Sequence, residues 1–214
     1  MKAQPENADH GARGFSLIEL MIVMVISLVV AAFALPNITS AITNMRLRSS
    51  VTSIAGILQE TRILAVKLNR FNVARNTTSS GANVFYTDLD FNNAYTPANN
   101  TTHVAAEPLV QAAQGVTFAT TPPTAFPNAA LLGPNFNPTA ATVFNVGFNA
   151  RGLPCIPTGG NPTTGTPASC NTDGTVGYLM FFKISGTFGD SWSAITITPA
   201  GRVRSWTLNG THWN

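Results

Sequence analysis

The sequence has little charge. Asp, Glu, Lys and Arg make up 10% of its 214 residues, with 12 basic and 9 acidic side chains and a formal net charge of +3. An ordinary soluble domain carries about 25%, so this composition excludes a charge-rich disordered protein and a protein coated with basic residues for nucleic acid. Thr (27) and Asn (20) supply neutral hydrogen-bonding groups instead, which is typical of an exported surface.

The sequence also lacks the motifs of an enzyme or a metal site. None of its three histidines, His10, His103 and His212, has a recognisable carboxylate or thiol partner. The GxSxG, HExxH and Walker-type glycine motifs are absent. The two cysteines, Cys155 and Cys170, have no CxxC spacing. We therefore expect a protein that is not an enzyme and that uses no cofactor or metal.

The segment between Cys155 and Cys170 is rich in Gly, Pro and Thr and cannot hold itself in one shape. The two cysteines are either joined in a disulfide or present as free thiols. In the chain-entropy model, closing a loop of about 15 residues contributes roughly 3 kcal/mol, provided that the compartment is oxidising, as the periplasm is. We expect the disulfide, as a structural bond that carries no chemistry.

One long apolar run dominates the N-terminal region. Residues 15–35 contain a single charge, Glu19, and two hydroxyl groups, Ser16 and Ser27. As a helix, the run would span roughly 31 Å at ~1.5 Å per residue, which is about the thickness of a bilayer's hydrocarbon core. A carboxylate near the bilayer centre costs on the order of 2.5–3.5 kcal/mol. Glu19 lies nearer the start of the run, yet any apolar residue would cost nothing there, so its retention suggests a partner cation.

Two simpler interpretations of the run are open. The first is a secretory signal peptide cut after residues 32–34, which have the A-x-A form, although the run exceeds the usual ~7–15 apolar residues. The second is a generic single-pass membrane anchor, whose orientation the flanking basic residues do not decide. Neither interpretation explains Glu19.

Residues 13–20 read RGFSLIEL and resemble the prepilin processing site that type IV pilins share with type II secretion pseudopilins. The resemblance implies that residues 1–14 are a leader peptide, cut between Gly14 and Phe15 by prepilin peptidase, with N-methylation of Phe15. It also implies that Glu19 meets the new N-terminal amine of a neighbouring subunit during assembly. The apolar helix would then be a membrane anchor before assembly and part of the filament core afterwards.

The helix is expected to continue beyond the apolar run. Pro36 removes one helical hydrogen bond and stands where many pilins have a helix-kinking proline. Apolar residues then recur at the alternating four-three spacing of one helix face. We predict an amphipathic continuation over 36–70, whose apolar face packs against a sheet and consists of Leu47, Val51, Ile54, Leu58, Ala65 and Leu68, with Thr61 in its single gap.

The remaining residues, 71–214, predict a β-rich globular domain. Residues 76–142 are rich in Asn, Thr, Ala and Pro and predict a long loop region around short strands. The alternating or continuous apolar patterns predict strands at 84–89, 116–119, 142–149, 177–184, 195–198 and 202–208. The predicted fold class is therefore α+β, with one long N-terminal helix packed on an antiparallel sheet.

Asp88 and Asp90 are two of the few charged residues in the loop region. A pair of aspartates at this spacing occurs in calcium-binding loops, but the glycine and the terminal glutamate of such a loop are missing. We interpret both aspartates as solvated turn residues.

Residues 148–154 (FNARGLP) and 195–204 (ITITPAGRVR) are similar to the globular domain of the GspH/FimT family of minor pilins and pseudopilins. The resemblance implies a precursor that crosses the bacterial inner membrane once, with its C-terminal domain in the periplasm. It implies assembly with other pilin or pseudopilin subunits, on an inner-membrane platform, into a filament in which this subunit lies at or near the tip. A type IV pilus and a type II secretion pseudopilus remain equally open.

Arg202 and Arg204 alternate along a predicted strand and would share a face with Trp206. Basic side chains beside an aromatic ring can bind phosphates and stack on bases. The alternative is two solvated arginines on an edge strand, where charge deters aggregation. In FimT-like proteins a GRxR motif is implicated in DNA uptake, and residues 201–204 fit it, although Thr207 stands where a further arginine is expected. A DNA-binding minor pilin is thus the alternative to a purely structural subunit.

Overall fold

The computed structural model describes eight parts of the chain. By Cα proximity, the chain divides into two compact units, Met1–Thr39 and Ser40–Asn214, which are treated separately below. The described residues are 15–79, 81–97, 106–119, 122–127, 144–158, 169–170, 176–186 and 189–214.

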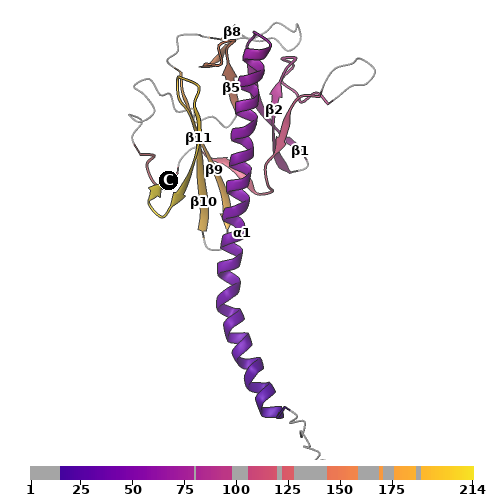
Figure 1. Cartoon of the computed structure of the whole chain (residues 1–214), viewed down its shortest axis with the longest axis vertical. Coiled ribbons are helices and arrows are strands. Elements are labelled where there is room, and N and C mark those ends of the chain that lie inside the picture. The colour runs from indigo at the N-terminus through magenta and orange to yellow at the C-terminus, as the bar shows by residue number, and fades with distance from the viewer. Residues whose placement is uncertain are drawn as a thin grey trace, which may run out of the picture. The chain divides into compact units, whose positions relative to one another are not determined.

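Helix α1 runs from Leu17 to Lys67 and is continuous through Pro36 (Figure 1). It ends in a Schellman-type cap, in which Asn69 adopts a left-handed conformation (φ 47°) and the Arg70 amide donates to the Ala65 carbonyl at 3.1 Å. The expected helix end at residue 70 is therefore three residues too late, because Asn69 reverses the chain first.

The apolar stripe of α1 is buried where the sequence predicts it, with one exception. Leu68 lies past the last helical turn and is 44% exposed. Thr61, in the gap of the stripe, is fully buried, and its hydroxyl donates to the Ile57 carbonyl (2.8 Å) and contacts the Thr87 hydroxyl (2.7 Å). Thr61 thus fills a core position with a satisfied polar pair. The buried members of the stripe are Leu47, Val51, Ile54, Leu58 and Ala65.

Two five-stranded sheets face the helix, and the strand pairs in them are antiparallel throughout the described residues. The first has the order β3-β2-β1-β5-β6, with β1 Asn72–Ser79, β2 Ala82–Asp88, β3 Leu109–Gln111, β5 Asn145–Phe148 and β6 Pro154–Cys155. The second has the order β12-β11-β10-β9-β4, with β4 Val116–Ala119, β9 Tyr178–Gly186, β10 Gly189–Ile197, β11 Val203–Asn209 and β12 His212–Trp213.

A short two-stranded sheet lies beside the first. It pairs β7 Pro157–Thr158 with β8 Ser169–Cys170, and a disulfide joins Cys155 to Cys170. Cys155 is fully buried in β6, so the bond fixes β8 to the body of the domain.

One hydrophobic core unites the helix and both sheets. It contains Leu58 from α1, Phe85 and Phe148 from the first sheet, and Phe182 and Ile195 from the second. Burying a large apolar side chain of this kind stabilises the fold by roughly 1.5–3 kcal/mol. The predicted fold class, one long N-terminal helix on antiparallel β-structure, is confirmed, although the strands divide into two sheets where one was expected.

Two local predictions are wrong. Strand β1 was not expected as a strand, since its Asn- and Thr-rich sequence reads as loop. Asp88 is not a solvated turn residue: it is the last residue of β2, is fully buried and pairs with Arg75, whose Nε lies 2.6 Å from Asp88 Oδ2. Asp90 is exposed in the following bend, as expected of a turn residue.

Tyr178 gives the domain a measurable dependence on alkaline pH. Its hydroxyl is buried and donates to the Cys155 carbonyl at 2.5 Å, and burial raises its pKa to about 12. A raised folded-state pKa means that the folded chain retains a proton that the unfolded chain releases near pH 10. This stability is full below pH 10 and is lost as pH rises toward 12.

We expect the free energy of unfolding to fall between pH 9 and pH 11 by about 1.4 kcal/mol more in the unsubstituted chain than in Tyr178→Phe. This is the free energy that corresponds to one pH unit above the pKa of the unfolded tyrosine. Urea denaturation at both pH values measures the difference. Burial also raises the pKa of Tyr86 to about 12. Tyr86 is present in both chains, so its contribution to the pH dependence cancels in the comparison. An equal loss in the two chains contradicts the assignment.

Candidate functional site

The N-terminal part of α1 is an apolar helix with no cover from its own chain. Fifteen large apolar side chains between Phe15 and Leu35 are exposed, from 49% at Val29 to 83% at Phe15. Burying them against an apolar environment would contribute on the order of tens of kcal/mol. Among the described residues, α1 is the helix long and apolar enough to cross a bilayer, with a mean hydropathy of 2.7 over its most apolar window.

Glu19 is the acidic residue of the first turn of α1 and is exposed in the isolated chain. A carboxylate is favoured at a helix N-terminus because the first backbone N–H groups are unpaired there. The predicted partner of Glu19 belongs to another subunit, and the cleavage position Gly14 lies outside the described residues. Phe15 directly precedes the helix. The predicted roles of Phe15, Glu19 and Pro36 remain predictions.

The two segments of the globular unit that resemble the GspH/FimT family meet at one side chain of α1. Arg62 donates from Nε to the Gly152 carbonyl (2.9 Å) and from Nη1 to the Gly201 carbonyl (2.9 Å). Gly152 belongs to the turn after β5, and Gly201 belongs to the turn between β10 and β11. Charge-assisted hydrogen bonds are stronger than neutral ones, so Arg62 acts as a latch between the helix and both turns.

Both turns need glycine at the latch. Gly152 and Gly201 have φ of +74° and +78°, which side chains other than glycine rarely adopt. A Cβ on Gly201 would also lie 2.6 Å from the Gly152 carbonyl oxygen and 3.1 Å from the Arg62 guanidinium carbon. The glycines therefore allow the two turns and the guanidinium to approach one another.

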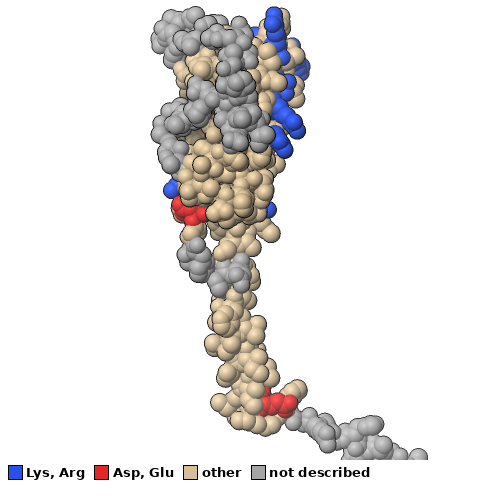
Figure 2. Space-filling model, turned by 90° about the vertical axis from the view of Figure 1, so that its left-hand side faces the viewer, with Lys and Arg blue, Asp and Glu red and all other residues tan. Residues whose placement is uncertain are grey.

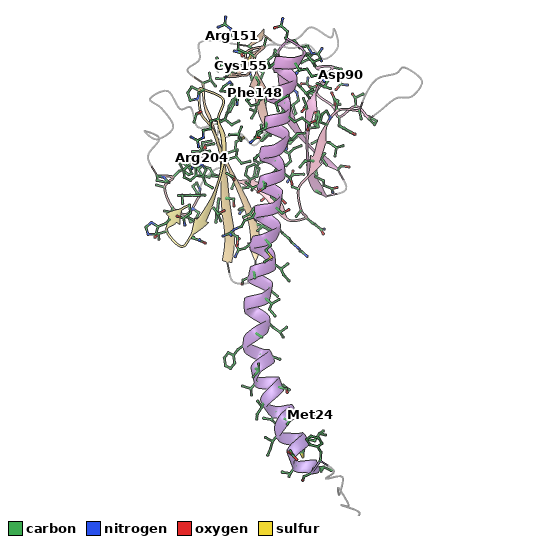
Figure 3. The ribbon with its side chains drawn as sticks, viewed as in Figure 1. Met24, Asp90, Phe148, Arg151, Cys155 and Arg204 are labelled. Carbon is green, nitrogen blue, oxygen red and sulfur yellow. A yellow bond between two sulfur atoms is a disulfide. The ribbon has the colours of Figure 1, made fainter. Side chains whose placement is uncertain are left out.

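Arg202 and Arg204 have different neighbours, and the prediction that they share a face with Trp206 stays a prediction. Arg204 projects from β11 (Figure 3), and its guanidinium carbon lies 4.8 Å from the centre of the Trp206 ring. Arg202 precedes β11 and lies beside α1, on a groove of about 620 Å³. The groove is lined by Gln59, Arg62, Ile63, Val66, Lys67, Ala200, Arg202 and Val203.

Trp206 is not an open platform for bases. The ring is half-buried and packs edge-on against Phe126 (centroids 5.5 Å apart), and its Nε1 donates to Thr196 Oγ1 at 2.9 Å. Since Arg204 lies over the ring, a base could stack there only if Arg204 moved. The exposed cations are thus the better candidates for contact with a ligand.

The groove is basic. Lys67 and Arg202 are exposed on it, and in the described part of the chain no acidic residue lines it or pairs with either arginine of the motif. Figure 2 shows Lys and Arg side chains gathered along one edge of the globular unit. Such an edge attracts an anionic partner.

The role of Arg62 was not predicted from the sequence. It lies on the polar flank of the apolar stripe, among other basic residues such as Arg46 and Arg48. The one available signal was that each family-like segment contains a glycine, and a glycine in a turn can mark the close approach of another group.

Comparison with known proteins identifies the N-terminal segment. Residues 9–35 match the family model described as the prokaryotic N-terminal methylation motif. This is the motif of type IV pilins, and it supports a pilin-like protein in general. The exposed apolar helix that follows is consistent with a membrane-anchored precursor.

Two further comparisons concern the whole chain. No curated protein matches it. Among solved structures, it is similar to the type IV minor pilin FimU of Pseudomonas aeruginosa, with 13% identity and a TM-score of 0.37, over 78% of this chain and 92% of that one.

The close contact of Gly201 with Gly152 and Arg62 can be tested by substitution, with Gly81 as the control. Gly81 has nearly the same φ (+77°) as Gly201 (+78°), but a Cβ there would meet nothing within 4 Å. Gly81→Ala should cost about 1–2 kcal/mol of unfolding free energy, for conformation alone. Gly201→Ala should cost about 1–3 kcal/mol more, because it also forces the Gly152 carbonyl and Arg62 apart. Urea denaturation measures both; equal losses would show that the latch is not tightly packed.

Proposed function

We propose that this chain is a minor pilin or a type II secretion pseudopilin of the GspH/FimT type. Its precursor is inserted once in the inner membrane, cut between Gly14 and Phe15 by prepilin peptidase and N-methylated at Phe15. The subunit then enters a periplasm-spanning filament, at or near the tip, as a structural component. The observation that carries this proposal is an exposed apolar helix that begins within an N-terminal methylation motif and bears one acid, Glu19.

This helix needs an apolar cover and a cation beside Glu19, and assembly into a filament would supply both. Neighbouring apolar helices would cover its exposed side chains, and a neighbouring N-terminal amine would pair with the Glu19 carboxylate. An unpaired charge among apolar neighbours is strongly disfavoured, and one opposite charge with hydrogen bonds largely offsets that cost. The two family-like segments, held together by Arg62, support the finer assignment to the GspH/FimT type.

Replacing Glu19 separates processing from assembly. We expect Glu19→Leu to be inserted and cut normally, since leucine suits a membrane helix better than glutamate. The variant should fail to enter the filament, since it cannot pair with the amine. Mass spectrometry of the mature chain should give a first residue of Phe15 that is heavier by one methyl group, and cross-linking to neighbouring subunits should measure assembly.

Glu60→Leu is the matched control, because Glu60 is an exposed acid of the same helix outside the apolar run. It should assemble as the unsubstituted chain does. Normal assembly of Glu19→Leu, or a mature chain that begins at Met1 or Leu35, would refute the proposal.

A second candidate function is DNA binding by the same subunit. The observation that favours it is that Arg202, Arg204 and Lys67 are exposed and have no acidic partner in the described part of the chain. These cations could contact phosphates, and the arginine pair falls within residues 201–204, which fit the GRxR motif.

Salt dependence tests this second function. If phosphates are contacted, the affinity of residues 40–214 for DNA should fall steeply as salt rises, and Arg202→Ala with Arg204→Ala should weaken binding and reduce the salt slope by about 2. Arg48→Ala, which removes an exposed cation elsewhere on α1, should change the binding less. Absence of salt-dependent binding, or equal binding by the double variant, rejects DNA contact.

A further inference from the structure

Three carboxylates converge beside the end of β2, two from neighbouring positions and one from a residue 17 positions further along the chain. Asp88, Asp90 and Glu107 each offer an oxygen atom, and these three atoms lie within 4.8 Å of one another. Asp88 and Glu107 are buried, whereas Asp90 is exposed and lies just past the strand (Figure 3). The cluster is therefore open to solvent on one side.

The backbone holds two of the acids firmly. Glu107 accepts from the Leu89 amide (2.5 Å) through Oε1 and from the Thr96 amide (2.8 Å) through Oε2. Asp90 accepts from the Asn92 amide (3.1 Å) and from the Thr96 hydroxyl (2.8 Å). These bonds fix the carboxylates in place without bringing a positive charge to them.

Asp88 has a buried carboxylate oxygen without a hydrogen-bond partner in the described part of the chain, which is evidence for a ligand beyond the clustering of the three acids. Its side chain is fully buried, and its Oδ2 accepts from Arg75 Nε (2.6 Å) and from the Asn93 amide (3.2 Å). Its Oδ1 is enclosed and has no hydrogen-bond partner within the described residues. Buried carboxylate oxygens are normally hydrogen-bonded or coordinate a metal. Since Oδ1 has no hydrogen-bond donor among the described residues, a metal ion is a suitable partner for it.

The cluster also has an excess of negative charge. Three carboxylates face one paired guanidinium, that of Arg75. The next cation, Arg70, donates to the Leu89 carbonyl (2.7 Å) rather than to an acid. Like charges this close repel strongly where water is excluded. Either a shared proton or a bound cation must offset the repulsion.

We propose that Asp88, Asp90 and Glu107 bind one calcium ion. Calcium prefers oxygen ligands, takes six to eight of them and tolerates irregular geometry. Three carboxylates, with water on the exposed side at Asp90, suit it. The segment Asp88–Asn92 also has acidic or amide residues at its first, third and fifth positions, as a calcium loop does. Glu107 supplies the acid that the sequence pattern lacked.

The site would fasten the segment that follows β2 to the first sheet. Asp88 belongs to the sheet, Asp90 to the bend after it, and Glu107 to the chain that leads into β3. One ion bound to all three would cross-link them. This role does not depend on filament assembly or on DNA binding.

Calorimetric titration of the full-length chain in detergent tests the proposal after removal of divalent ions with a chelator. We expect one calcium ion per chain, with a Kd on the order of 10⁻⁴–10⁻³ M, as in extracellular modules. Calcium should also raise the midpoint of thermal unfolding, with a concentration dependence that follows the same Kd. Magnesium should bind at least tenfold more weakly, because it demands a near-ideal octahedron.

Asp90→Asn is the informative variant. Asp90 is exposed and an asparagine oxygen can still accept from the Asn92 amide, so the fold should survive while calcium affinity falls at least tenfold. Asp190→Asn is the control, since Asp190 is an exposed acid that pairs with Lys183 (3.5 Å) on another strand; its calcium affinity should not change.

Three results would overturn the calcium site. The first is that the unsubstituted chain binds no calcium up to millimolar concentration, in which case a shared proton neutralises the cluster. The second is calcium binding that Asp90→Asn leaves unchanged, and the third is magnesium binding as tight as that of calcium. None of these results bears on the Glu19 experiment.

Discussion

The constraint on which the rest of the structure depends is that an apolar helix of one chain has no apolar cover within that chain. Every large apolar side chain from Phe15 to Leu35 is exposed, and the hydrophobic core of the globular unit begins only at Leu47. Water is a poor solvent for such a surface. A bilayer and a bundle of like helices are the two environments that remove it from water, and a helix of this length suits both.

The globular unit uses the same helix in a different way. Beyond residue 40 one face of α1 is buried by both sheets, and the flank of that face carries Arg62, which joins the turns at Gly152 and Gly201. Those turns lie at the ends of strands in different sheets. The helix therefore holds the two sheets together twice, through the hydrophobic core and through Arg62. The exposed cations Lys67 and Arg202 line the same groove as the latch. A change at Arg62 would therefore alter the basic surface without touching those two residues.

The sequence predicts those features that depend on periodicity. The helix, its buried stripe and the strands near residues 116–119 and 177–184 follow from apolar spacing, which burial imposes directly. Strand β1 has no such signal: its Asn and Thr residues pair with β2 and β5 through the backbone, and only its first half is buried. Pairing that rests on backbone hydrogen bonds leaves little trace in side-chain pattern.

Contacts between distant residues were predicted poorly. The position of Arg202 beside α1, on the same groove as Lys67, had no signal in the sequence, because the groove joins residues more than 130 positions apart. The acids at residues 88 and 90 looked like a solvated turn because Glu107, which completes the cluster, lies 17 residues beyond Asp90 and has no fixed spacing from it. Arg62 could not be told from other helix-flank cations for the same reason.

The scarcity of charge gives these contacts their meaning. In a chain with 9 acidic residues, three of them share one small site, while a fourth stands alone in an apolar helix. On a charge-rich surface such arrangements arise by chance and are solvated. Here most surface polarity comes from Thr and Asn, which need no counterion. A carboxylate that has no cation partner among the described residues therefore suggests a partner from outside the chain. On our proposals, Glu19 would meet another subunit, and Asp90 and Glu107, which have no cation partner among the described residues, would share a calcium ion with the Arg75-paired Asp88.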